Sequence, residues 1–170
     1  SRNESNLEQA QESICAVTDR QTDSVLPVTV DLAEKEAIEA GINTTVDTFG
    51  GLDVLVTNHP GPANGAFAEA ELEAFDAGYN DILRSTLIQC KAALPALRAD
   101  GGAITHLVAA STAEPNAYGC VGTVFRAGIY GLSKTIATEE GDHEVRSNCV
   151  APRGVRSDRI ESKIAARAER

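Results

Sequence analysis

A tyrosine and a lysine four residues apart form the most chemically suggestive pair in the sequence. Tyr130 and Lys134 lie in the stretch GTVFRAGIYGLSKTIA. A phenol can donate a proton, and a nearby ammonium group favours its deprotonated form. The pair could therefore supply an acid and its cationic helper, provided that the surrounding elements place it at a reacting site.

Four short β-branched runs with turn or polar residues beside them predict buried strands, at 25–30, 52–58, 103–109 and 145–151. Helical patterns lie between them at about 34–48, 69–97 and 122–139, and residues 156–170 predict a final charged helix. This alternation predicts an α/β fold with a parallel sheet and helices on both faces. His106 falls inside an apolar strand, where we expect a structural role. Residues 1–170 are interpreted as a single domain.

Composition excludes several classes of protein. A formal charge of -10 disfavours nucleic acid and anionic lipid as partners. No apolar run is long enough for a membrane span, and there is no signal pattern. The four cysteines have no C-x-x-C spacing and no histidine cluster beside them, which predicts reduced thiols, no metal site and a cytoplasmic location.

The sequence has no methionine or tryptophan and few aromatic residues. This acidic, small-residue composition is typical of proteins from salt-loving cells, and an ordinary acidic cytosolic protein is the alternative. Because a chain that begins with SRNES does not show its own translation start, a segment upstream could be missing.

Several longer stretches have a recognisable order. They are VTVDLAEKEAIEAGINTTVDTFGGLDVLVTNHPGP, QCKAALPALRADGGAITHLVAAS, RAGIYGLSKTIATEE and VRSNCVAPRGVRSDRI. Together they resemble the short-chain dehydrogenase/reductase family over nearly the whole chain, and more narrowly its 3-oxoacyl-carrier-protein reductase-like members. The resemblance implies an NAD(P)-dependent oxidoreductase acting on a small-molecule carbonyl or alcohol. It also implies a homo-oligomer built through the helices at 69–97 and 122–139.

The resemblance implies a three-layer, doubly wound Rossmann-type sheet that is incomplete in this chain. The family's first two strands, its glycine-rich phosphate turn and its last strand have no counterpart here. Because the family's sheet has the order 3-2-1-4-5-6-7, the predicted strand at 25–30 lacks its neighbour. We expect either a longer intact protein or a substitute partner for this strand, beside 52–58 or in another chain.

The family's asparagine, serine, tyrosine and lysine positions carry other residues here. The alignment places them at Ile82, Ala109, Gly122 and Arg126. Tyr130 and Lys134 come eight residues too late, about 12 Å along a helix, and are interpreted as structural. Gly122 has no proton to give, whereas Arg126 keeps a positive charge but is a poor proton donor.

Substitute catalytic groups are few. Arg126 and Ser111 are the catalytic candidates, and Tyr118 is a further nearby hydroxyl. An arginine at the lysine position also resembles halohydrin dehalogenases, which use Ser, Tyr and Arg without a nucleotide, but only Arg126 of that set is present.

The cofactor candidates follow from the resemblance. They are Asp31 and Leu32 for adenine, Asn58 after the next strand, Arg2 for a 2′-phosphate, and Val155 and Ser157 near a nicotinamide. Arg2 favours NADP slightly over NAD. Two hypotheses follow: an NAD(P)-dependent oxidoreductase with a degenerate active site, or a non-catalytic Rossmann-like protein that acts through oligomerisation or partner binding.

Overall fold

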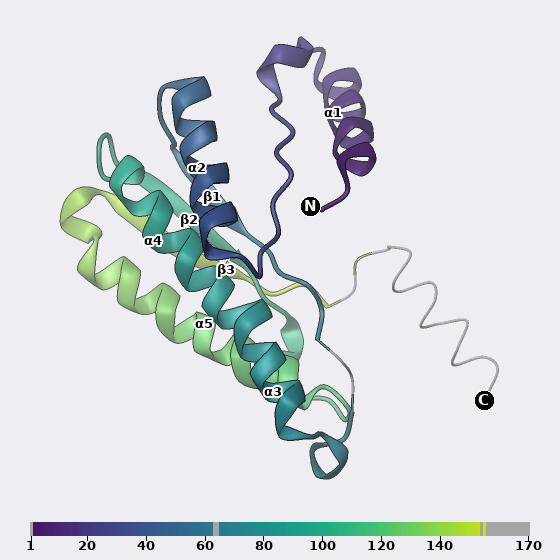
Figure 1. Ribbon diagram of the computed structural model, residues 1–170. Helices are drawn as coiled ribbons and strands as arrows, with labels where there is room; N and C mark the ends of the chain where they lie inside the picture. Colours follow the sequence, from purple (N-terminus) through teal and green to yellow (C-terminus); the bar gives the residue numbers. More distant parts are fainter. Residues whose placement is uncertain (1, 63–64, 154, 156–170) are drawn as a thin grey trace.

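The computed structural model describes residues 2–62, 65–153 and 155. These residues form five α-helices and three strands, and a helical segment separates each strand from the next (Figure 1). The α-helices are α1 (Glu4–Thr18), α2 (Lys35–Phe49), α3 (Leu72–Gly78), α4 (Ser85–Leu97) and α5 (Cys120–Glu139). The strands are β1 (Val54–Thr57), β2 (Gly102–Leu107) and β3 (Val145–Val150). The predicted α/β class is confirmed, and the predicted helix at 156–170 lies outside the described residues.

The three strands form one parallel sheet in the order β1-β2-β3. Leu55 pairs with Ile104, which pairs with Ser147, so these side chains point to the same side of the sheet. Helices α4 and α5 pack against this side, which we call the covered face (Figure 1). The opposite side, the open face, carries Val54 and Val56, which are 54% and 55% exposed.

The hydrophobic core lies between the covered face and the helices. Its main cluster joins Cys90, Ala93 and Leu97 of α4 to Ile104 of β2, together with residues of α5 and β3. A second cluster near the carboxyl ends of the strands packs Ile82 against Val108 and Ile129. The helices are therefore attached to one side of the sheet along its whole depth.

A buried polar network crosses this core. His106 is fully buried, with its Nδ1 2.9 Å from the Thr57 hydroxyl and its Nε2 3.2 Å from the Ser147 hydroxyl. The Ser133 hydroxyl of α5 lies 2.9 Å from that of Ser147. Burial lowers the pKa of His106 to about 4. The structural role expected for His106 is confirmed.

The long helical run predicted at 69–97 is interrupted. A π-helical segment, η3 (Tyr79–Arg84), links α3 to α4. Gly78, where α3 ends, allows a close approach to α5, since a Cβ there would collide with the Val121 side chain. Segments of π-helix occur frequently at functional sites, and this one contains Ile82.

The prediction of a strand at 25–30 was wrong. This segment is not paired in the described residues, because the sheet has no neighbouring strand to receive its backbone groups. Val28 and Val30 instead lie against Gly41 of α2, and the Val25 carbonyl accepts a hydrogen bond of 2.7 Å from Gln11. The expected substitute partner beside 52–58 does not form, because β1 pairs only with β2.

Helix α1 was not predicted. Its N-cap, Asn3, accepts a hydrogen bond of 3.2 Å from the Asn6 backbone N–H. The helix carries no buried residue, and Figure 1 shows it standing apart from α4 and α5.

Candidate active site

The carboxyl ends of β1 and β2 bring together most of the positions singled out from the sequence. In parallel α/β sheets, ligands bind in the crevice beyond these ends. The chain leaves β1 at Thr57 and leaves β2 at Leu107, and α5 begins nearby at Cys120. The loops that follow the two strands therefore surround a common edge.

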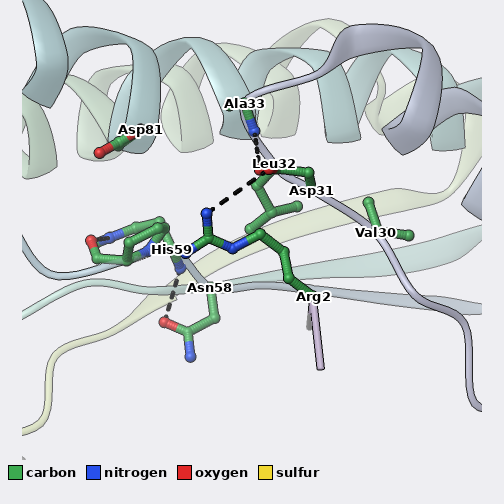
Figure 2. Close-up of a pocket in the computed structure, with 9 residues that line it drawn as sticks. Arg2, Val30, Asp31, Leu32, Ala33, Asn58, His59 and Asp81 are labelled. Carbon is green, nitrogen blue, oxygen red and sulfur yellow. Dashed lines mark hydrogen bonds and ion pairs between the residues drawn. The ribbon is translucent and has the colours of Figure 1, made fainter. Parts of the chain in front are cut away.

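A pocket of about 410 Å³ lies at this edge. Four of the predicted cofactor residues line it: Arg2, Asp31, Leu32 and Asn58 (Figure 2). They come from the start of the chain, from the segment before α2 and from the end of β1, so only the fold brings them together. Its wall also includes His59, Pro60 and Asp81, which were not predicted as site residues.

The Asp31 carboxylate is held in place on two sides. Its Oδ1 accepts a hydrogen bond of 3.0 Å from the Ala33 backbone N–H, and its Oδ2 lies 3.7 Å from Arg2 Nη1 (Figure 2). Both side chains are substantially exposed, so the ion pair itself adds little stability. What it does is place an acceptor and a cation side by side in the pocket.

His59 occupies part of the space after β1. Its Nδ1 lies 3.0 Å from the Pro60 carbonyl, which can only accept, so Nδ1 carries the hydrogen in this contact. Burial, and then the nearby charge of Arg126, lower the pKa of His59, while the Pro60 hydrogen bond and Asp81 oppose them. The neutral form of His59 is therefore favoured, and its ring lies within electrostatic range of Arg126.

The positions that the resemblance assigns to the family's asparagine and serine carry apolar groups. Ile82 is fully buried and packs against Val108 and Ile129. Ala109 follows β2 in extended backbone and has only a methyl group to offer. Neither can donate or accept a hydrogen bond through its side chain.

Gly122 and Arg126 interact directly in space. A Cβ on Gly122 would lie 2.5 Å from Nη1 of Arg126 and 3.0 Å from Cγ of Pro62. The guanidinium therefore covers the glycine where a longer side chain would start. At this point the Arg126 guanidinium lies next to a glycine, which has no side chain that could donate a proton.

The remaining candidates lie apart from the pocket. Tyr130 is 38% exposed and Lys134 is exposed, both on α5 well beyond its first turn. Ser111 is half-buried in the short helix after β2, and Val155 is exposed. Ser157 lies outside the described residues.

Two hydroxyl groups near the site were missed by sequence reasoning. Thr112 Oγ1 and Thr123 Oγ1 are buried, and neither has a hydrogen-bond partner in the described residues. Thr123 directly follows Gly122 and Thr112 directly follows Ser111. A search for hydroxyls next to the aligned positions, rather than only at them, could have found both.

The chain was compared with protein families, with curated proteins and with solved structures. Residues 3–169 match the family described as "Enoyl-(Acyl carrier protein) reductase". A probable short-chain type dehydrogenase/reductase of Bradyrhizobium diazoefficiens is 32% identical over 140 residues, covering 79% of this chain and 50% of the relative. The chain belongs to the short-chain dehydrogenase/reductase family.

Members with named substrates are also similar. Trans-4-hydroxycyclohexanecarboxylate dehydrogenase of Sinomonas cyclohexanicum is 31% identical, over 79% of this chain and 52% of that protein. L-sorbose reductase from Gluconobacter frateurii, solved with NADPH and L-sorbose, superimposes with a TM-score of 0.90 at 27% identity, over 99% of this chain and 63% of that one. This short-chain dehydrogenase/reductase chain spans about half the length of the curated relatives it matches.

Three further features of the described residues concern membrane-spanning helices, metal ligands and cysteines. No helix there combines the length and apolar character needed to cross a membrane. The same residues contain no group of histidine, cysteine or acidic side chains that could hold a metal ion. All four cysteines are free, and burial raises the pKa of the Cys90 thiol to about 12.

Proposed function

We propose that the chain forms the adenosine-binding side and the substrate side of an NAD(P)-dependent oxidoreductase with a degenerate active site. The observation that supports this most strongly is the pocket in which Arg2, Asp31, Leu32 and Asn58 meet. These residues lie far apart in the sequence, and each was chosen only because the resemblance assigns it to a cofactor-binding position. In keeping with free cysteines, we place the protein in the cytoplasm.

The pocket fits the adenosine end of a dinucleotide. An ionised carboxylate accepts hydrogen bonds only, so Asp31 suits the exocyclic amine of adenine. Arg2, 3.7 Å from Asp31, offers a guanidinium for a ribose hydroxyl or a 2′-phosphate, which favours NADP. The nicotinamide, when bound, would supply or accept the hydride.

Proton handling is where this chain departs from its family. A positioned general acid contributes roughly 10²- to 10⁴-fold to a rate, and Gly122 offers none. Arg126 can stabilise negative charge on a substrate oxygen but holds its own proton too tightly to donate it. We therefore expect carbonyl reduction to be slow, with any residual turnover dependent on Arg126, whereas binding of the adenosine end of the nucleotide needs no acid and should be retained.

Nucleotide titration tests the binding half of the proposal. NADPH and NADH fluorescence should report binding, with NADPH the tighter ligand, and Asp31→Ala should weaken both. Asp47→Ala is the matched control, because Asp47 is an exposed carboxylate on α2 and does not line the pocket. Equal affinities for the two variants would contradict the assignment of this pocket.

A restoration experiment tests the degenerate site. A tyrosine at 122 must displace the Arg126 guanidinium, so Gly122→Tyr alone should restore less carbonyl reduction than Gly122→Tyr with Arg126→Lys. In the double variant we expect a gain of about 10²-fold or more over the unaltered chain. Efficient turnover by the unaltered chain that survives Arg126→Ala would overturn the degenerate-site proposal.

Association is the second candidate function. Large apolar side chains are exposed on α3, on the π-helical segment and on α5, among them Leu72, Tyr79 and Tyr130. Exposed apolar groups clustered on neighbouring helices mark interaction surfaces. We propose that they form a contact between two copies of the chain.

Light scattering after size-exclusion chromatography measures this association. Tyr130→Glu should convert a dimer or tetramer to a smaller species, whereas Thr138→Glu, elsewhere on the exposed side of α5, should not. Nucleotide binding without turnover, together with a stable oligomer, would favour the association function over the catalytic one. A monomer at every concentration would exclude it.

A further inference from the structure

His59 has a hydrogen-bonding nitrogen that the described residues leave unpaired. The residue follows β1 and lines the same pocket as Arg2, Asp31 and Asn58 (Figure 2). Its Nδ1 carries a hydrogen and donates it to the Pro60 carbonyl at 3.0 Å, so Nε2 of the neutral ring is an acceptor. This Nε2 is shielded from solvent and has no hydrogen-bond partner among the described residues.

The unpaired nitrogen indicates a missing donor, because a buried polar atom without a partner costs free energy. The Asp81 carboxylate on the pocket wall does not supply one, since an ionised carboxylate only accepts hydrogen bonds. The ring of His59 is only half-buried, and the χ2 torsion of histidine is broad. A small rotation therefore presents Nε2 to a hydroxyl or N–H group of a molecule bound in the pocket.

The charges around His59 favour the acceptor form of this nitrogen. Burial lowers the pKa of His59, as does the Arg126 guanidinium of α5, while Asp81 of η3 opposes them. Arg2 and Asp31 are the other charged residues that line the pocket. A neutral acceptor attracts a hydroxyl group but not an ionised phosphate oxygen, which has no hydrogen to donate.

We propose that His59 is a specificity-determining residue, whose Nε2 accepts a hydrogen bond from a ribose hydroxyl of the bound nucleotide. The inference rests on the proposed function, which places adenine beside Asp31, and it adds a residue that the sequence did not single out as a site residue. The ribose is favoured over other hydroxyl-bearing groups because it is attached directly to the base, and Asp31 and His59 line one pocket of about 410 Å³. An ordered water molecule is the competing partner.

The first test establishes which ring nitrogen of His59 carries the hydrogen. In nitrogen NMR spectra of the chain labelled on histidine, we expect a protonated Nδ1 and a bare Nε2 at neutral pH. Adenosine should then shift the Nε2 resonance in a saturable way. A neutral ring protonated on Nε2 would overturn the proposal, because that nitrogen could not accept a hydrogen bond.

The second test is a cycle between His59 and the ribose hydroxyls, with adenosine and 2′,3′-dideoxyadenosine as the probes. By calorimetry, the unaltered chain should bind the dideoxy compound about fivefold or more weakly. His59→Phe keeps a ring but removes the acceptor, so most of this preference should disappear. An equal preference in the two proteins would contradict the inference and would indicate that His59 contacts water or serves packing alone.

Two variants control for damage to the fold. His59→Gln retains an acceptor oxygen in its amide and should recover part of the preference for adenosine. His143→Ala removes an exposed histidine that does not line the pocket, and it should leave the preference intact. If His143→Ala abolished the preference as fully as His59→Phe, the assignment to His59 would be wrong.

Acid provides a measurement that needs no variant. Protonation of His59 converts Nε2 from an acceptor to a donor. The preference for adenosine over the dideoxy compound should therefore fall as the pH drops below about 6.5, the usual value for histidine. A constant preference while the NMR signals show His59 gaining a proton would overturn the proposal.

The outcomes separate this inference from the proposed function. If neither NADPH nor adenosine binds, the proposed function fails, and the inference fails with it. If NADPH and adenosine bind but the dideoxy compound binds as tightly as adenosine, only the role of His59 is overturned. If the preference depends on His59 and NADPH binds, both are supported.

Discussion

The two faces of the three-stranded sheet consist of alternate residues of the same strands and meet different surroundings. On the covered face, Ile104 and His106 are fully buried beneath helices, whereas on the open face Val54 and Val56 are about half exposed. The open-face residues are as β-branched as any core strand. An apolar pattern can therefore identify a strand. It does not show which face of the strand is covered by helices of the same chain.

The difference between the two faces also predicts where substitutions will change stability and ligand binding together. The covered face ends at the carboxyl edge with Thr57 and Val108, next to the candidate site, so the helices that cover it also position Gly122 and Arg126. We therefore expect substitutions on the covered face to change both stability and ligand binding. Those on the open face should change neither by much.

The largest expected effect is on the covered face. Ile104→Ala should lower the free energy of unfolding by roughly 2–5 kcal/mol, because it leaves a cavity in the main cluster. Chemical denaturation of the variant and the unaltered chain measures this. A loss below about 1 kcal/mol would show that the covered face is not the principal core.

Acid should destabilise the covered face through His106. Its pKa is about 4 in the folded protein, against about 6.5 when unfolded. The unfolded chain therefore binds more protons between these values, so stability falls as the pH falls from 6.5 towards 4, by about 3 kcal/mol in all. Denaturation from pH 7 to 4 tests this, and His106→Gln should flatten that part of the profile whereas Ser133→Ala should not.

The polar network on the same face predicts a smaller effect. Thr57→Val removes the partner of His106 Nδ1 and should cost roughly 1–3 kcal/mol, since a buried polar atom loses its hydrogen bond. Adding His106→Leu should recover part of that loss, because the unpaired imidazole nitrogen is then removed while the Ser147 hydroxyl keeps its contact with Ser133. Strict additivity of the two substitutions would argue against a working network.

The smallest expected effect is on the open face. Val56→Ala should change the free energy of unfolding by less than about 0.5 kcal/mol, because the side chain is already half exposed. This variant is the matched control for Ile104→Ala, since Val56 lies in the adjacent strand and points to the opposite side. A cost above about 1 kcal/mol would mean that another surface covers the open face.

Much of the fold followed from the sequence, because strand and helix periodicities are local properties. The strands at 52–58, 103–109 and 145–151 formed close to their predicted bounds, as did the helix at 34–48. The segment at 25–30 failed for a non-local reason: a strand requires a neighbour, and its residues carry no information about whether one is present. The π-helical segment at Tyr79–Arg84 likewise depends on packing against α5 rather than on composition.

The candidate site was partly foreseeable. Family positions pointed to Asp31 and Asn58, and the fold brings both into one pocket. The position of the Arg126 guanidinium over Gly122 was not foreseeable. It depends on the conformation of a long, flexible side chain beside a residue that has no side chain. The left-handed backbone conformation of Tyr118 was not foreseeable either, because nothing in the residue type predicts it.

The guanidinium that rests over Gly122 has a consequence for descent as well as for chemistry. In a chain that carries both glycine and arginine, a tyrosine at position 122 fits only after the Arg126 guanidinium has moved away from it. We therefore expect present-day relatives to carry tyrosine with lysine, or glycine with arginine, far more often than the mixed combinations.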